Sequence, residues 1–306
     1  MSRLEAAPAA PSPALEGSIP VVPLRHPARR AFAILLVILA AAAAWNVATN
    51  HRFGWDVVAN YLFAPEILRG GLLTVVLTVI SMVVGVVLGI ALAVMRISDN
   101  SIVSTISRGY IWFFRGTPML VQLIFWYNIA ALYPTLSIGI PFGGPHIVIG
   151  SANALITPLG AALLGLSLNE AAYMAEIIRG GIGSVDKGQY DAAHALGMNS
   201  IQLMYRVVLP QAMRVVLPPT GNEVISMLKA TSLVSVLAIS DLLYSAQIIY
   251  SLNYRTIPLL IVASFWYLLM TSILSYFQDK LEKHYGRGFT ASVTTKRRRL
   301  AMGRTK

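Results

Sequence analysis

The chain of 306 residues contains no cysteine and is short of charge. Without cysteine it can form no disulfide, no thiolate-ligated zinc site and no thiol nucleophile. Only 12% of its residues are charged, whereas 56% are hydrophobic. A soluble domain carries about 25% charged residues, so this chain has too few to cover a globular surface in water. The composition therefore indicates a protein whose surface faces lipid.

Motifs for nucleotide binding and catalysis are missing as well. The chain has no G-x-x-x-x-G-K-[ST] phosphate loop and no Gly-Lys dipeptide at all,. It has no G-x-S-x-G nucleophile elbow and no H-E-x-x-H zinc motif,. His146 and His194 have no partners at metal-ligand spacing. We therefore predict no enzyme active site, no metal and no cofactor in this chain, so that any ATP must be bound by another subunit.

The net charge of +11 is concentrated at one end of the chain. Nine of the 24 basic residues lie beyond Tyr276, including Lys296-Arg297-Arg298-Arg299, and most of the others flank apolar segments. Basic residues beside membrane helices set topology or contact anionic lipid headgroups. This distribution predicts the lipid bilayer as a partner and argues against nucleic acid.

Six apolar segments are candidates for crossing a bilayer as helices. A hydrocarbon layer of about 30 Å needs roughly 20 apolar residues. The expected fold class is thus an all-α integral membrane protein, a helical bundle of about six transmembrane helices. The six expected segments are 31–48, 71–95, 119–133, 156–178, 216–238 and 256–277.

Two of these segments contain prolines that disturb a helix. The helix of the third segment is expected to start near Arg108 and to be interrupted near Gly116-Thr117-Pro118, because proline disfavours helical conformation in the residue before it. The fifth segment contains Pro218-Pro219. Its helix is expected to begin after this pair or to be kinked there.

Basic residues near the ends of the segments favour one orientation. Fifteen Lys and Arg residues lie on one side and three, Arg52, Arg69 and Arg255, on the other. The positive-inside rule assigns the richer side to the cytoplasm. Six spans then place both termini there. We expect residues 1–30, rich in Ala, Pro and Ser, to be a disordered tail, and residues 286–306 to be a basic tail.

Residues 31–65 have two interpretations. Arg29-Arg30, the apolar run and the alanines 41–44 fit an extra N-terminal transmembrane helix followed by an external loop. They also fit a secretory signal whose removal would leave five spans. The long polar head and the length of the run favour the uncleaved helix.

A polar and basic loop, residues 184–210, separates the fourth and fifth segments. Its pattern predicts two short helices. In the first, residues 189–196, a small apolar face is expected; its members are Ala192, Ala193, Ala195 and Leu196. Gly197 is placed for a left-handed C-terminal cap. Asn199 or Ser200 can cap a second helix through Val208, and Pro210 and the Pro218-Pro219 pair are expected to end the helical run.

The same loop resembles the cytoplasmic "EAA" loop of ABC-transporter permeases. The matching residues are Asp191-Ala192-Ala193, Gly197 and Val207-x-Leu209-Pro210. Asp191 replaces the usual Glu of the family and Val207 the usual Ile, which leaves the charge and the shape in place. The resemblance implies that this loop couples the chain to an ATPase subunit. The implied coupling residues are Gly188, Gln189, Asp191, Ala192, Ala193, Gly197, Leu209 and Pro210.

The resemblance extends over about residues 70–285. Residues 115–122, R-G-T-P-M-L-V-Q, are similar to the R-G-T-P-L-L-V-Q segment of the polar amino-acid subfamily, the histidine, glutamine and arginine permeases. The segments 169–176, 179–182, 209–212 and 229–233 fit as well. This implies a permease domain over 66–285, with the five-helix core of a type I importer, and an additional helix before it.

Partners and location follow from the resemblance. It implies two copies of an ABC ATPase, a second permease subunit in a homodimer or heterodimer, and an extracytoplasmic solute-binding protein. The membrane would be the cytoplasmic (inner) membrane of a prokaryote. The solute would be a polar amino acid, with an opine or a cystine-like solute as alternatives. An ion-gradient-driven secondary transporter and a membrane scaffold without transport activity are the competing hypotheses.

Several polar residues lie at membrane depth, where a charge costs at least about 2.5 kcal/mol. One interpretation makes them a path for a zwitterionic solute, and the other makes them interhelical hydrogen bonds and salt bridges. Glu176 and Arg179, spaced i, i+3, are expected to pair with each other. Gly85-x-x-x-Gly89 is expected to allow close helix packing within the chain. The candidate solute-path residues are Asn169, Glu170, Asn222, Glu223 and Lys229.

Overall fold

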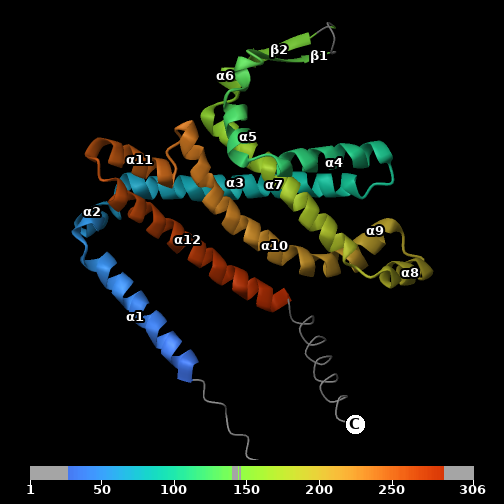
Figure 1. The fold of residues 1–306 in the computed structure, drawn as a ribbon. Coiled ribbons are helices and arrows are strands. Elements are labelled where there is room, and N and C mark those ends of the chain that lie inside the picture. The colour runs from blue at the N-terminus through green and yellow to red at the C-terminus, as the bar shows by residue number, and fades with distance from the viewer. Residues whose placement is uncertain (1–26, 140–143, 145, 286–306) are drawn as a thin grey trace, which may run out of the picture. The chain divides into compact units, whose positions relative to one another are not determined.

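The computed structural model describes residues 27–139, 144 and 146–285 (Figure 1). The predicted tails, apart from residues 27–30, lie outside this range. The chain divides into two compact units that meet between Phe53 and Gly54. The first consists of α1 (Pro27–Thr49) and the short η1 (His51–Phe53). The apolar α1 is long enough to cross a membrane, as predicted for residues 31–48.

The second unit is organised around two long helices, α3 (Pro65–Arg96) and α7 (Pro158–Gly183), which follow the short α2 (Trp55–Tyr61). Two glycines of α3 make their close packing possible. A Cβ placed at Gly85 would lie 2.6 Å from Cγ of Glu170, and one at Gly89 would lie 2.6 Å from Cβ of Met174. The expected packing of this glycine pair within the chain is therefore confirmed.

The third predicted segment consists of two helices. The first, α4 (Ser101–Gly116), is capped by the side chain of Asn100 and begins before the expected start near Arg108. After a break at Thr117-Pro118, where it was expected, come α5 (Met119–Tyr127) and the short η2 (Ile129–Ala131). With 16 and nine residues, α4 and α5 are each shorter than a membrane span requires.

An antiparallel hairpin that the sequence analysis missed follows η2. Its strands are β1 (Thr135–Gly139) and β2 (His146–Ser151), with a register irregularity between Leu136 and Ser137. The hairpin leads through α6 (Ala152–Leu155) into α7. Residues 116–169 contain no Lys, Arg, Asp or Glu, and isoleucines of both strands are exposed, Ile138 by 72% and Ile147 by 77%.

The helix after the polar loop differs most from expectation. α10 (Leu209–Ala230) begins before Pro210 and continues through Pro218 and Pro219. The expectation that these prolines end the helical run, or that the fifth helix begins after them, is therefore wrong, while the alternative, a kink at Pro218-Pro219, stays a prediction. Proline is accepted in the first turn because no N–H is needed there. Membrane helices tolerate internal proline where neighbouring helices support them, and α12 (Thr256–Tyr285) packs along α10.

After α10 the chain continues through η4 (Thr231–Leu237) into α11 (Leu242–Asn253), a helix that the sequence analysis did not predict. The segments Ser200–Leu237 and Leu242–Asn253 meet at an angle of 44° and together have the length and hydropathy of a broken span. Among the described residues, four helices can cross a membrane by length and composition, and this pair makes a fifth if it crosses as one bent span. The protein is an all-α membrane bundle that carries one small hairpin.

Candidate functional site

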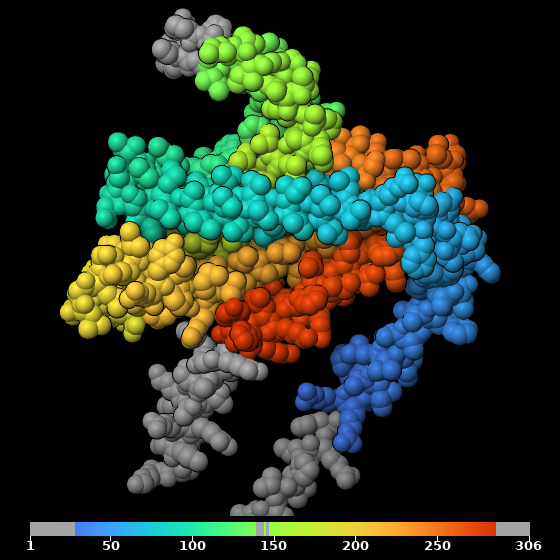
Figure 2. Space-filling view, turned by 180° about the vertical axis from the view of Figure 1, so that it is seen from behind, coloured from blue at the N-terminus to red at the C-terminus, as the bar shows by residue number. Residues whose placement is uncertain are grey.

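The loop 184–210 folds as the two predicted short helices. They are α8 (Lys187–Ala195) and α9 (Ser200–Leu203), and α9 continues as the π-helical η3 (Met204–Val208) into α10. The carboxylate of Asp186 caps α8 by accepting a 2.7 Å hydrogen bond from the backbone N–H of Gly188. Figure 2 shows this segment in yellow as a protrusion separate from the hairpin in green.

The corner between α8 and α9 is fixed by Gly197. Its φ of 72° lies in the left-handed region, which glycine adopts without strain. Its N–H donates to the carbonyl of His194, and the N–H of Met198 donates to that of Ala193. Asn199 and Gln202 then form a reciprocal capping box, with hydrogen bonds of 2.9 and 3.2 Å. The predicted cap at Gly197 is confirmed, and of the two predicted caps of the second helix, Asn199 and Ser200, the structure uses Asn199.

The apolar side chains of this loop face two ways. Ala193 is buried in a cluster with Val185, Leu203, Val208 and Ala212. The other alanines and Leu196 are exposed, so the expected single face of Ala192, Ala193, Ala195 and Leu196 is wrong. The most exposed large apolar side chains of the loop are instead those of Leu196, Ile201 and Tyr205, which are 76%, 72% and 69% exposed.

The other residues predicted for coupling lie on α8 and in the first turn of α10. Gly188, Gln189 and Asp191 are exposed on α8. The amide of Gln211 in α10 donates to Oε1 of Gln189 at 3.3 Å and to the Val207 carbonyl at 3.0 Å. Leu209 and Pro210 are exposed in the first turn of α10. Gln211 thus joins α8 to the start of α10, a contact that the sequence analysis did not predict.

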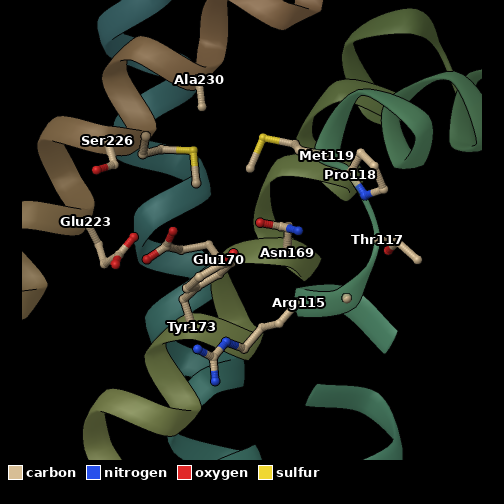
Figure 3. A pocket seen from close by; sticks show the side chains of 12 residues that line it. Arg115, Thr117, Pro118, Met119, Asn169, Glu170, Tyr173, Glu223, Ser226 and Ala230 are labelled. Atoms are coloured by element: carbon tan, nitrogen blue, oxygen red, sulfur yellow. The ribbon is translucent and has the colours of Figure 1, made fainter. Parts of the chain in front are cut away.

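A cavity of about 560 Å³ lies where the α4–α5 break meets α7 and α10. Figure 3 shows the carboxylates of Glu170 and Glu223 pointing toward each other on one side of the cavity. Glu170 is 3% exposed, and its Oε1 has no hydrogen-bond partner in the described part of the chain. On the same wall, the guanidinium of Arg115 lies over the ring of Tyr173, 5.1 Å from its centroid. The lining residues are Arg115, Gly116, Thr117, Pro118, Met119, Asn169, Glu170, Tyr173, Glu223, Ser226, Met227 and Ala230.

Asn169 lines the cavity but is held by the helix break. Its amide donates to the Phe114 carbonyl at 2.9 Å and to Oε1 of Gln122 at 3.2 Å. Gln122 in turn donates to Phe114 O and to the hydroxyl oxygen of Thr117. Both amides thereby donate to the Phe114 carbonyl, which loses its helical partner because Pro118, four residues later, has no N–H,. The sequence analysis missed Gln122, although an amide four residues after a helix-breaking proline is a usable signal.

The other candidates for the solute path lie elsewhere. Asn222 and Lys229 are exposed on α10 and do not line the cavity. Glu176 and Arg179 form the predicted ion pair at 2.7 Å. No group of three His, Cys, Asp or Glu side chains suited to a metal ion occurs among residues 27–139, 144 and 146–285. The structure thus brings together three of the five candidates, namely Asn169, Glu170 and Glu223.

Fold and sequence together define the class of this protein. Residues 85–287 match the family described as the inner membrane component of binding-protein-dependent transport systems. The chain belongs to this family, and it is the permease subunit of an ABC importer.

Individual relatives are amino-acid and opine permeases. The chain is 46% identical to the arginine transport system permease protein ArgU of Corynebacterium glutamicum, over 97% of this chain and 92% of the relative. It is 39% identical to the nopaline transport system permease protein NocM of Agrobacterium fabrum, over 69% and 84%. A crystal structure of an amino acid ABC transporter with histidines matches with a TM-score of 0.64 and 34% identity, over 75% of this chain and 98% of that one.

Proposed function

We propose that this permease imports a cationic amino acid of the arginine type through the cavity between α7 and α10. The observation that carries the proposal is the facing pair of carboxylates, Glu170 and Glu223, of which Glu170 presents an unpartnered buried oxygen. A buried carboxylate without a partner is costly in a membrane. A solute that brings an ammonium or guanidinium group would supply the missing donors.

The rest of the cavity suits the other end of such a solute. Arg115 offers a cation to the carboxylate of an amino acid, and Tyr173 and Met119 offer contact to its alkyl chain. The volume of about 560 Å³ lies within the range of small-molecule sites, roughly 300–1,000 Å³. The printed functions of the relatives, transport of arginine and of nopaline, favour this solute class. They give no support to an ion-gradient-driven mechanism.

Coupling to ATP is assigned to the loop 184–210. In this proposal the exposed surface of Leu196, Ile201 and Tyr205 docks an ABC ATPase, and Gly197 keeps α8 and α9 at a fixed angle. The ATPase, present in two copies, binds the ATP. A second permease subunit and an extracytoplasmic binding protein complete the importer. With α4 and α5 together making the sixth crossing, the loop and both termini face the cytoplasm of a prokaryotic cell, as the distribution of basic residues favours.

Uptake by the complete importer in proteoliposomes tests the solute. We expect uptake of labelled L-arginine that requires ATP and that excess unlabelled L-lysine competes with, whereas L-cystine does not. Glu170→Gln should lower uptake at least about tenfold, because one charge-assisted contact is worth roughly 1.5–3 kcal/mol. Glu66→Gln, the same change at an exposed position of α3, is the matched control. Unchanged uptake in Glu170→Gln would exclude the carboxylate pair from the solute path.

A further inference from the structure

A polar contact joins the middle of α10 to α12. The Nε2 of Gln278 donates a 2.7 Å hydrogen bond to the Pro218 carbonyl and a 2.9 Å hydrogen bond to Oε1 of Glu282. Gln278 is 8% exposed. Both N–H groups of this amide are therefore used, which fixes the orientation of the side chain.

Gly221 in α10 leaves the space that the side chain of Gln278 occupies. A Cβ at Gly221 would overlap the side-chain oxygen of Gln278, so any larger residue would displace the amide. Pro218 and Pro219 lack the N–H groups that would bond to the carbonyls of Arg214 and Val215 one turn earlier. Gln278 thus holds α10 at the point where the helix has the fewest hydrogen bonds of its own.

This point lies between the two ends of α10 that matter for transport. The N-terminal end continues directly from the loop 184–210 and is tied to α8 through Gln211. The C-terminal end places Glu223, Ser226 and Met227 in the cavity wall. Proline pairs are common sites of helix bending. A displacement of the loop reaches the cavity only if the middle of α10 does not yield to it.

We propose that Gln278 is a positioning residue for transport, which anchors α10 at residues 218–221 so that the helix turns about this point. A displacement of the loop 184–210 by the ATPase then moves the cavity wall at Glu223 and Ser226 instead of bending the helix at its prolines. The inference rests on the proposed coupling role of the loop. Gln278 itself contacts neither the solute nor the ATPase.

The absence of cysteine from the chain allows a direct test. Ser226→Cys places one reporter thiol in the cavity wall, at an exposed position. In the complete importer in nanodiscs, the rate of its labelling by a water-soluble maleimide is measured on the permease band, without nucleotide and with Mg-ATP and vanadate. With Gln278 present we expect nucleotide to change this rate about tenfold, as typical coupling energies between sites allow.

Gln278→Met keeps the length of the side chain and removes its N–H donors. We expect this variant to reduce the nucleotide response to within about twofold, while the amount of bound ATPase and the nucleotide-free labelling rate stay unchanged and the complex loses no more stability than one interhelical hydrogen bond contributes. Gly221→Ala, which displaces the amide, should reduce the response similarly. Asp279→Asn, at the exposed neighbouring position of α12, should keep the full response.

A full nucleotide response in Gln278→Met would overturn the inference. A lower melting temperature with an unchanged response in the remaining complex would do so too, because it would mean that Gln278 only stabilises the fold. Gly197→Leu separates this failure from that of the proposed function. If Gly197→Leu loses the response and Gln278→Met keeps it, the coupling role of the loop stands and the role of Gln278 fails. If Gly197→Leu also keeps it, the coupling role itself is wrong.

Discussion

The loop 184–210 and the cavity between α7 and α10 are built in opposite ways. The loop is one continuous stretch whose caps reach only two or three residues along the chain, from Asp186 to Gly188 and between Asn199 and Gln202. The cavity is assembled from four helices, and the hydrogen bond from Asn169 to Phe114 joins residues that are 55 positions apart in the sequence. The loop exposes apolar side chains, whereas the cavity is lined by two carboxylates, of which that of Glu170 is buried.

Because of this difference, we expect substitutions in the loop and substitutions around the cavity to have different effects. A change in the loop strains a local corner and leaves the bundle intact, so that under the proposed function we expect it to affect coupling alone. A change around the cavity disturbs contacts between distant segments, so that we expect it to affect both the fold and the proposed solute path. Four substitutions, two in each region, test whether effects on stability and effects on transport differ between the two regions in this way.

The largest effect on the fold is expected from Gly85→Leu. A Cβ at this position would lie 2.6 and 2.7 Å from side-chain atoms of Glu170, so leucine must push α3 away from α7. Overpacking of this kind costs about 3 kcal/mol. Unfolding in mixed detergent micelles and the yield in the membrane measure the loss. Gly71→Leu is the matched control, because nothing lies within 4 Å of a Cβ there, and equal losses from both would contradict the account.

Gly197→Leu should abolish ATP-dependent uptake and leave the chain in the membrane at its normal level. No atom lies within 4 Å of a Cβ at this glycine, so the substitution acts through backbone strain of about 1–2 kcal/mol at a φ of 72°,. Uptake and a membrane immunoblot measure the two properties. Asparagine adopts this conformation more readily, and Gly197→Asn should therefore keep more activity. Full uptake by the leucine variant would contradict the coupling role.

Asn169→Leu tests the cavity by removing a hydrogen-bonded side chain, whereas the two preceding substitutions replace glycines. It removes the hydrogen bonds to Phe114 and Gln122, and interhelical hydrogen bonds in membranes contribute about 1 kcal/mol. We expect a lower unfolding midpoint together with reduced solute uptake, because the α4–α5 break forms part of the cavity wall. A variant of normal stability and uptake would show that the break does not need this amide.

Asn199→Ala is the counterpart of that change in the loop and should have the smallest effect. Loss of a helix cap costs about 1 kcal/mol, here confined to α9. The midpoint of global unfolding should stay unchanged, while hydrogen exchange of the amides of α9 speeds up about fivefold. Ser200→Ala, one residue further along, serves as the control. A shift in global unfolding would show that the loop is not the independent element described above.

The sequence predicts those features that depend on neighbouring residues. Apolar run length located α1, α3, α7 and α12, and capping rules located Gly197 and narrowed the second cap to Asn199 or Ser200. The same rules could not tell which alanine of α8 points inward. That choice is made by the cluster of Val185, Leu203, Val208 and Ala212, whose geometry depends on how η3 enters α10.

The features that the sequence did not predict depend on distant segments. Proline rules placed a helix end at Pro218-Pro219, but packing against α12 keeps α10 continuous. The sequence analysis also did not predict α11, the helix that follows the break after η4. Charge at membrane depth identified Glu170 and Glu223 as candidates, yet it also identified Lys229, which the turn of α10 places outside the cavity. Only the assembled helices distinguish a residue of the cavity wall from one on the outer surface.

The central claim, that the loop 184–210 docks an ATPase on one side of the membrane, is tested most directly by crosslinking from single cysteines. Ile201→Cys probes the loop, and Ile147→Cys probes the hairpin, which is connected to the opposite end of the 26-residue α7. Both side chains are more than 70% exposed. We predict a crosslink to an ABC ATPase subunit from position 201 and none from position 147. No ATPase crosslink from position 201, or one from position 147, would contradict the account.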